Sequence, residues 1–274
     1  MPPIENHATK HTLVEEVIAK LRYFSQLYGI NSIFIVGGYC REHYLGTPWK
    51  VKDIDVASAY HDQALQLGGL FASEVLKVPP IFYERTGTAM IEYVSEIGSI
   101  KVEFQGRSVS AYMHSEDVKE WLRQEGVEDV PLMNNIYGRD FTINSLIYSL
   151  HSGNMYDPTN LAVRDFHHRS IRSLLPPEML IKYNPLAALR AVRFALQYDF
   201  RIDPALRHAI KLAGIDNLKA SLSEERIVRE IAKILKIKAQ EGLEMLKKLE
   251  LDRILLHPDV KRYLELGSKG EQDA

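Results

Sequence analysis

The hydrophobic periodicity of the chain changes once, near residue 150, and this change most limits the folds open to it. Before that point, apolar residues recur either at helical spacing or in short alternating runs; after it, helical spacing dominates. We therefore predict an α+β domain with a small mixed sheet at residues 1–152, followed by an all-helical domain at residues 153–274. A chain of 274 residues is long enough for two modest domains.

The individual elements follow from the spacing of the apolar residues. In the first half, the predicted helices are 11–28, 63–77 and 116–124, and the predicted strands are 32–36, 52–57, 89–94 and 99–104. From Asp140 onward we expect almost only helices, the clearest being 185–198, 204–213 and 223–237. Asn184 followed by Pro185 predicts the start of the first of these, with Asn184 as the N-cap.

Composition and charge narrow the functional classes. The chain has one cysteine, Cys40, no apolar run of about 18 residues and no signal-like N-terminus, so we expect a cytoplasmic protein that is not in a membrane. The net charge is −2, but residues 161–238 hold 15 Lys and Arg against 8 Asp and Glu, a net of +7, which leaves −9 for the rest. A basic half can hold the phosphates of RNA and an acidic half can hold metal ions, although excess Lys and Arg also occur on solvated helix faces.

A glycine pair follows the first predicted strand. Gly37 and Gly38 come directly after an apolar run, and Arg41 follows about one helical turn later. Glycines let backbone N–H groups approach a phosphate closely, and an arginine can clamp the same anion. The segment is therefore a candidate phosphate site, with a plain strand-to-helix turn as the alternative.

Two acidic residues interrupt the next predicted strand. Asp53 and Asp55 lie two positions apart, so their side chains share one face, where carboxylate oxygens suit Mg²⁺. Aspartate is unfavourable in strand interiors, so the pair needs a functional explanation. Glu103, in the alternating run 100–104, is a candidate third carboxylate if a neighbouring strand brings it alongside; otherwise it is an exposed strand residue. Two Mg²⁺ ions bridged by the aspartates would suit phosphoryl transfer from a triphosphate.

Several segments in register resemble a known family. They are Ile35-Val36-Gly37-Gly38-Tyr39-Cys40-Arg41, Lys52-Asp53-Ile54-Asp55, Gly138-Arg139-Asp140-Phe141-Thr142-Ile143-Asn144-Ser145, Tyr156-Asp157-Pro158, Ile171-Arg172-Ser173, the run 184–194 and Ser223–Ile227. Together they resemble the signatures of the class II tRNA nucleotidyltransferase and bacterial poly(A) polymerase family over residues 30–240. The resemblance implies a nucleotidyltransferase head followed by a helical neck, and a reaction that moves NMP from ATP or CTP, without a template, to an RNA 3′ end, with tRNA as the favoured acceptor.

The resemblance also implies roles for individual residues. Asp53 and Asp55 become Mg²⁺ ligands and, with Glu103, the catalytic acids, and Asp140 is expected near the ribose. The full set of expected nucleotide-binding residues is Gly37, Gly38, Arg41, Arg139, Asp140, Asn144, Asn184, Arg190 and Arg193. Arginines expected to contact RNA are Arg164, Arg169, Arg172 and Arg226.

The sequence departs from the family in its base-selecting helix. The family pattern Glu-Asp-x-x-Arg reads Tyr183, Asn184 and Ala187 here, and Gly138 replaces the first Arg of the second signature. Arg190 lies one turn beyond Ala187 and either substitutes as a base reader or forms a salt bridge or phosphate contact. Body and tail regions are expected to be largely missing after Leu256. The nucleotide added, the RNA acceptor and the oligomeric state stay open, as do two alternatives: a non-RNA acceptor, and a non-catalytic RNA-binding relative.

Overall fold

The computed structural model describes residues 7–60, 62–77, 79–83, 87–105, 110–221 and 223–256. Internal contacts divide the chain into two compact units. The first, which we call the head unit, comprises Met1–Arg139 and Ile143–Ala162; the second, the neck unit, comprises Asp140–Thr142 and Val163–Ala274. The head unit therefore extends ten residues beyond the boundary expected from sequence at residue 152.

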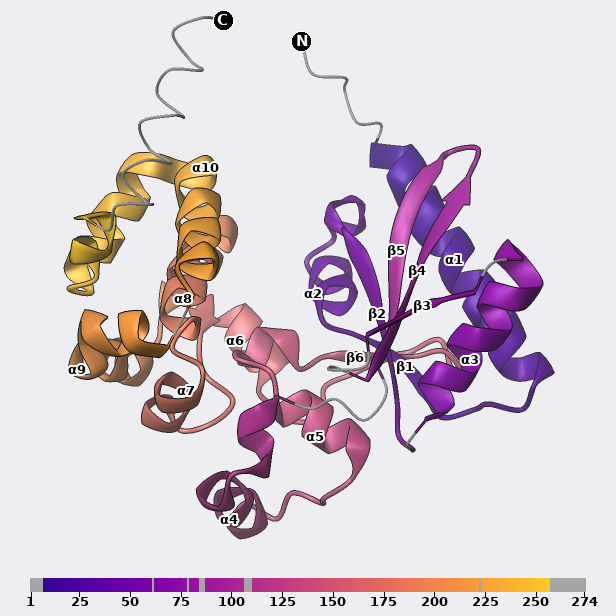
Figure 1. Cartoon of the computed structure of the whole chain (residues 1–274), viewed down its shortest axis with the longest axis horizontal. Coiled ribbons are helices and arrows are strands. Elements are labelled where there is room, and N and C mark those ends of the chain that lie inside the picture. Colours follow the sequence, from indigo (N-terminus) through magenta and orange to yellow (C-terminus); the bar gives the residue numbers. More distant parts are fainter. Residues whose placement is uncertain are drawn as a thin grey trace, which may run out of the picture. The chain divides into compact units, whose positions relative to one another are not determined.

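The head unit is built on a seven-stranded mixed sheet (Figure 1). Its strands, in chain order, are β1 (Ile33–Val36), β2 (Asp53–Ser58), β3 (Ile81–Tyr83), β4 (Thr88–Ser95), β5 (Gly98–Gln105), β6 (Ile147–Ser149) and β7 (Met155–Tyr156). In space the order is β3-β4-β5-β2-β1-β6-β7. Strands β2 and β5 run parallel, and the other neighbouring pairs are antiparallel.

The described part of the head unit also contains helices. They are α1 (His7–Leu27), α2 (Gly38–Tyr44), α3 (Gln63–Phe71), α4 (Glu116–Gln124) and α5 (Pro131–Tyr137), with short helical turns at Pro48–Lys50, Ala72–Leu76, Ala111–His114 and Thr142–Asn144. Helix α1 buries Leu13, Val17 and Leu21, which recur at helical spacing, and it packs with α3 against β5. Figure 1 shows α1 and α3 on one side of these strands and α2 on the other.

Strand β2 presents two different faces because its side chains alternate. Ile54 and Val56 are fully buried on one face. On the other face Ala57 is buried beside Val36, in a cluster that α5 completes with Ile136. Asp53 and Asp55 share that second face, nearer the start of the strand, and they are less buried than Ala57. The sheet therefore holds its two acids rigidly at the edge of a packed core.

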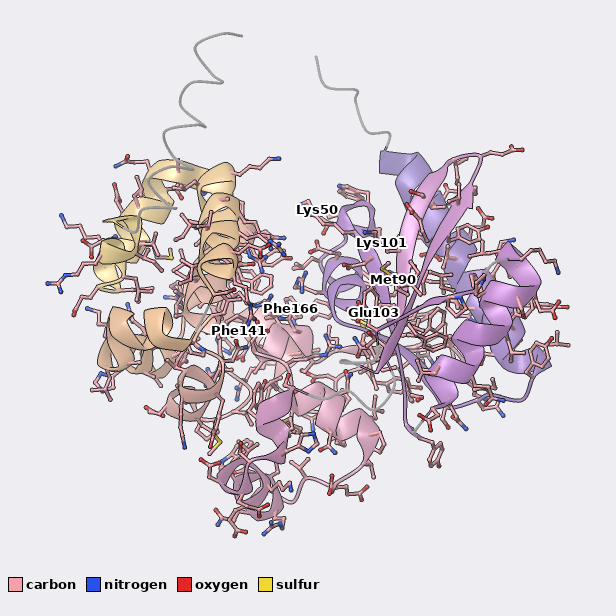
Figure 2. All side chains as sticks on the ribbon, viewed as in Figure 1. Lys50, Met90, Lys101, Glu103, Phe141 and Phe166 are labelled. Carbon is pink, nitrogen blue, oxygen red and sulfur yellow. The ribbon has the colours of Figure 1, made fainter. Side chains whose placement is uncertain are left out.

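The neck unit is mainly helical. Its elements are α6 (Ala162–His167), α7 (Pro177–Tyr183), α8 (Ala187–Tyr198), α9 (Pro204–Ser221), α10 (Glu224–Lys248), a final turn at Asp252–Leu256, and two strands, β8 (Ser170–Ile171) and β9 (Arg201–Ile202). Helix α8 packs against α10, and α7 packs against α9. Aromatic pairs close the core: Phe141 meets Phe194 edge-on at 5.8 Å, and Phe166 meets Phe200 at 6.2 Å between ring centroids (Figure 2 labels Phe141 and Phe166).

The structure confirms the α+β head and the helical character of the neck, together with the helices and strands predicted at residues 11–124. Two expectations were wrong. Residues 147–156 are not helical, because β6 and β7 extend the head sheet, and β8 pairs with β9 in parallel within the neck. These strands have two or three residues each, too few for an alternating pattern to appear in the sequence.

The expected N-cap at Asn184 was also wrong. Asn184 ends α7, and α8 begins three residues later, at Ala187. The carbonyl oxygen of Asn184 accepts the N–H of Ala187, and that of Pro185 accepts the N–H of Ala188, so a tighter turn joins the two helices. The N–H of Asn184 donates to the carbonyl oxygen of Leu180, so Asn184 closes α7 instead of capping α8.

No described helix combines the length and the apolar character that crossing a membrane would require.

Candidate active site

The turn after β1 lies beside four charged side chains of the head unit. Gly37 has φ +71° and ψ −126°, a conformation that favours glycine. A Cβ atom at Gly37 would lie 2.7 Å from both Asp55 Oδ2 and Arg139 Nη1. At Gly38 the nearest groups are Asp53 Oδ1 and Arg41 Nη2, at 3.8 and 3.9 Å from such an atom. The glycine pair therefore faces both aspartates and two arginines.

The register of the sheet places Glu103, the third candidate acid, beside Asp53 and Asp55. Asp55 pairs with Val36 on β1 and with Glu103 on β5, while Asp53 pairs with Lys101. Figure 2 labels Glu103 and Lys101, with Met90 on the neighbouring strand β4. The juxtaposition of Glu103 with the aspartates that the sequence suggested is therefore found, and it depends on the parallel pairing of β2 and β5.

The carboxyl groups of this cluster oppose one another's ionisation. Burial, partly offset by Arg139, raises the pKa of Asp55 to about 7, and the neighbouring charges of Asp53 and Glu103 contribute to the rise. Burial and the charge of Asp53 also raise the pKa of Glu103. Burial and neighbouring negative charge thus favour the protonated forms of Asp55 and Glu103.

Two arginines flank the acids, and polar side chains hold both in place. Arg41 donates from Nη1 to Asn144 Oδ1 at 2.5 Å, and its Nη2 lies 3.4 Å from an oxygen of the buried Glu42. Arg139 donates from Nη2 to Asn135 Oδ1 at 3.0 Å. Arg41, Arg139 and Asn144 were expected at the site from the sequence, whereas Glu42 and Asn135 were not, because no sequence pattern shows which polar residue supports a given arginine.

Other expected nucleotide-binding residues lie in the neck unit. Arg190 donates from Nε to Oδ2 of the buried Asp140, and its guanidinium lies 5.4 Å from the Phe194 ring centroid. Arg193 forms an ion pair with the buried Glu230 of α10 at 2.7 Å. Of the three interpretations of Arg190, the salt bridge is the one found. The nucleotide-binding roles of Arg190 and Arg193 remain predictions.

Residue 187, where the family resemblance places a base-reading arginine, has no polar side chain here. Ala187 is fully buried in the first turn of α8, and Asn184 is partly exposed at the end of α7. An alanine provides no hydrogen-bond donor to a base, so any reader of the base edge has to come from another residue.

The four arginines expected to contact RNA differ in their surroundings. Arg164 and Arg172 share the fully buried Asp165, at 3.3 and 3.2 Å. Arg169 lies 3.8 Å from Asp199, with both side chains exposed. Arg226 is exposed in the first turn of α10. All four lie within the neck unit, and their contact with RNA stays a prediction.

The head sheet, its glycine turn and its paired carboxylates, followed by a helical unit, define the fold class of head-and-neck nucleotidyltransferases. The sequence profile of the poly(A) polymerase head domain matches residues 33–172, about half of the chain. The chain belongs to this family.

Curated relatives agree with this assignment. The chain is 29% identical over 205 residues to the CCA-adding enzyme of Lacticaseibacillus paracasei, covering 74% of this chain and 46% of the relative. It is 29% identical over 273 residues to poly(A) polymerase I of Salmonella typhi, covering 95% of this chain and 54% of the relative. The chain thus spans about half the length of these relatives.

Solved structures show the same fold. A CCA-adding enzyme in complex with ATP aligns with a TM-score of 0.67 at 22% identity, covering 88% of this chain and 51% of that one. A tRNA nucleotidyltransferase complexed with a primer tRNA and an incoming ATP analogue aligns with a TM-score of 0.66 at 25% identity. The alignment covers 86% of this chain and 62% of that one. The likeness extends well beyond the residues of the family profile.

Proposed function

We propose that this protein is a metal-dependent RNA nucleotidyltransferase, which transfers NMP from ATP or CTP to an RNA 3′ end, with a tRNA as the favoured acceptor. The observation that carries the proposal is the placement of Asp53, Asp55 and Glu103 opposite the Gly37–Gly38 turn. Relatives named as CCA-adding enzymes and poly(A) polymerases support it, as do neighbours solved with ATP and with tRNA.

The residues present fit Mg²⁺. Asp53 and Asp55 offer hard carboxylate oxygens on one strand face. Burial is the main cause of the raised pKa of Asp55, the charges of Asp53 and Glu103 add to it, and a divalent cation would favour the ionised carboxylate. Among the described residues no group of three or more His, Cys, Asp and Glu side chains forms a ready metal cluster, so we assign the two aspartates as ligands, with triphosphate oxygens completing the shell. Two bound ions would neutralise phosphate charge and lower the pKa of an attacking hydroxyl.

The protein's own groups then position the nucleotide. The backbone at Gly37 and Gly38 lets phosphate oxygens approach without a side chain in the way, and Arg41 and Arg139 supply positive charge beside them. Because Asn144 and Asn135 already fix these arginines, little side-chain entropy is lost on binding. From the family resemblance we also assign Asp140 and Arg190, which pair with each other within the neck unit, to nucleotide binding.

Incorporation of labelled nucleotides tests the proposal. Purified protein with Mg²⁺ would receive each of the four NTPs singly, with three acceptors: tRNA lacking CCA, tRNA ending in CC, and an unstructured RNA. We expect transfer to RNA that chelation abolishes and that Asp53→Asn reduces by about 1,000-fold or more, in line with the loss of a catalytic metal ligand. Glu128→Gln removes an exposed carboxylate between α4 and α5 and serves as the matched control.

The choice of acceptor and nucleotide distinguishes tRNA end repair from poly(A) synthesis and from unselective addition. Addition of C and A only to the tRNAs would indicate tRNA end repair, and A-tails on every RNA would indicate poly(A) synthesis. Equal use of all four NTPs would follow from the alanine at position 187. Transfer to no RNA, by a protein that still binds Mg²⁺ and NTP, would contradict the proposal and favour a non-RNA acceptor.

A further inference from the structure

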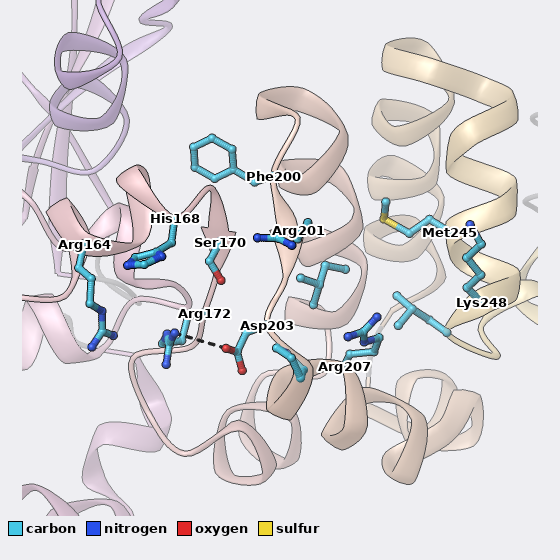
Figure 3. A pocket seen from close by; sticks show the side chains of 13 residues that line it. Arg164, His168, Ser170, Arg172, Phe200, Arg201, Asp203, Arg207, Met245 and Lys248 are labelled. Carbon is cyan, nitrogen blue, oxygen red and sulfur yellow. Dashed lines mark ion pairs between the residues drawn. The ribbon is translucent and has the colours of Figure 1, made fainter.

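A basic cavity of about 590 Å³ lies within the neck unit, between β9 and the C-terminal part of α10 (Figure 3). Its residues come from four segments: α6 and the turn after it, β8, β9 with the start of α9, and α10. None of the acids of the head unit contributes to it. No step of the proposed transfer reaction requires a cavity here, so its chemistry calls for a separate account.

The charge balance of the cavity is strongly positive. Five cations line it, namely Arg164, Arg172, Arg201, Arg207 and Lys248. Two carboxylates offset them: Asp203 in the lining, 3.5 Å from Arg172, and the buried Asp165 behind it, which contacts Arg164 and Arg172. Five cations against two carboxylates leaves three positive charges.

These three charges belong to residues without an acidic partner. Arg201, Arg207 and Lys248 have no carboxylate within ion-pair distance among the described residues, and all three are exposed at the cavity. They come from β9, α9 and α10, so the fold brings together three cations that are distant in sequence. Three like charges around one cavity repel one another, and an anion between them would relieve that repulsion.

Besides the charged residues, the lining contains the polar His168 and Ser170 and an apolar wall. Phe200, Ile202 and Leu249 are buried, and Met245 lies beside Lys248 on α10 (Figure 3). Cations beside an apolar wall suit a ligand with a phosphate at one end and a ring or sugar at the other. Inorganic anions alone would leave that wall unused.

We propose that this cavity binds a nucleotide unit, with Arg201, Arg207 and Lys248 holding its phosphate and the apolar wall packing against its sugar or base. Two sources share this chemistry: a segment of single-stranded RNA, and a free nucleotide. The RNA source rests on the proposed function, since it would give the neck unit a grip on the acceptor strand. The free nucleotide would make the cavity an accessory binding site.

Met245 provides a reporter inside the cavity. Whole protein labelled at the methionine methyl groups gives a Met245 NMR signal, assigned by its loss in Met245→Leu. The probes are a 12-nucleotide single-stranded RNA, AMP and inorganic phosphate, titrated in EDTA so that no transfer occurs. We expect the Met245 signal to shift saturably with the RNA or with AMP. A shift with RNA at much lower concentration than with AMP would identify the strand, and the reverse would identify the free nucleotide.

Matched triple variants test the assignment of the cations. Arg201→Gln/Arg207→Gln/Lys248→Gln is expected to weaken binding at least tenfold by the Met245 signal. The control, Lys236→Gln/Lys247→Gln/Arg253→Gln, removes the same charge from exposed positions of the same unit outside the cavity lining, and should bind within about twofold of wild type. If the triple variant does not fold, Arg207→Gln alone should weaken binding at least threefold.

Three results would overturn the proposal: no shift of Met245 with either nucleotide probe, a shift with inorganic phosphate of equal affinity, or equal weakening by both triple variants. None of these readouts needs catalysis. Failure here is therefore distinguishable from failure of the proposed transfer reaction, which Asp53→Asn and Mg²⁺ removal test separately.

Discussion

Gly37 is the residue of the candidate site with the least freedom to change. Its φ of +71° is costly for any other residue, and a methyl group there would collide with Asp55 and Arg139. We expect Gly37→Ala to lower stability by about 1–3 kcal/mol and to abolish transfer, because the two groups beside the turn would have to move.

A substitution at Gly126 separates the effect of backbone strain from the effect of the collision. It has φ +70° but no atom within 4 Å of an added Cβ, so Gly126→Ala carries the backbone strain without the collision. Denaturant unfolding should show a similar loss of about 1–2 kcal/mol, with transfer activity retained. Equal activity in the two variants would mean that the turn does not position the site.

Asp55 links the site to stability through pH. The ordinary pKa of an aspartate is 3.8, and burial raises that of Asp55 to about 7. In the metal-free protein the folded state therefore holds a proton that the unfolded state has lost, so stability falls as pH rises from about 4 to 7 and stays low above it. Asp55→Asn lacks this loss, and at pH 8 in EDTA it should be about 1–3 kcal/mol more stable than wild type.

Unfolding by urea at several pH values checks this. The difference between Asp55→Asn and wild type should shrink to near zero at about pH 3, where Asp55 is largely protonated in both the folded and the unfolded wild type. Adding Mg²⁺ at pH 8 should stabilise the wild type and leave the variant almost unchanged. A variant less stable than wild type at pH 8 in EDTA would contradict the assigned pKa shift.

Among the secondary-structure elements, α8 and α10 are joined by an ion pair. Arg193 is only 13% exposed and lies 2.7 Å from the buried Glu230, which Lys233 also contacts. Burial by itself would raise the pKa of Glu230, but Arg193 and Lys233 lower it overall. Removing one partner would leave a buried charge without compensation.

We therefore expect Glu230→Ala to cost about 3 kcal/mol of unfolding free energy. Glu225→Ala, which breaks an exposed pair with Arg229 on the same helix, should cost less than about 1 kcal/mol. The double variant Arg193→Met/Glu230→Met should recover much of the loss, since it leaves no buried charge. Similar losses in Glu230→Ala and Glu225→Ala, measured by urea unfolding, would show that the buried pair is not a main link between the helices.

Across the molecule as a whole, charge is divided unequally along the chain. Residues 161–238 carry +7 while the full chain carries −2, so the average charge hides a basic region. If RNA binds there, each phosphate contact adds about 0.7 to the slope of log affinity against log salt for a single strand. Four contacts would reduce affinity about 50-fold between 50 and 200 mM salt.

Fluorescence anisotropy with a labelled single-stranded RNA would measure that slope. We expect Arg226→Gln to lower its magnitude by about 0.7, and Lys52→Gln in the head unit, outside the basic region, to lower it by less. An affinity independent of salt would rule out phosphate contacts as the basis of binding.

Local sequence patterns are sufficient to specify the α+β head, the helical neck, the glycine turn and the paired aspartates. Apolar periodicity, the freedom of glycine and the alternation of side chains in a strand all act over a few residues. Most of the candidate catalytic residues, including Asp53 and Asp55, can therefore be named from the sequence alone.

The remaining features depend on tertiary contacts. The parallel pairing of β2 and β5 places Glu103 beside Asp55, and Arg190 of α8 pairs with Asp140. Tertiary packing also gathers Arg201, Arg207 and Lys248 around one cavity. Each of these depends on which distant segments meet, and the pattern within a segment does not encode its neighbour.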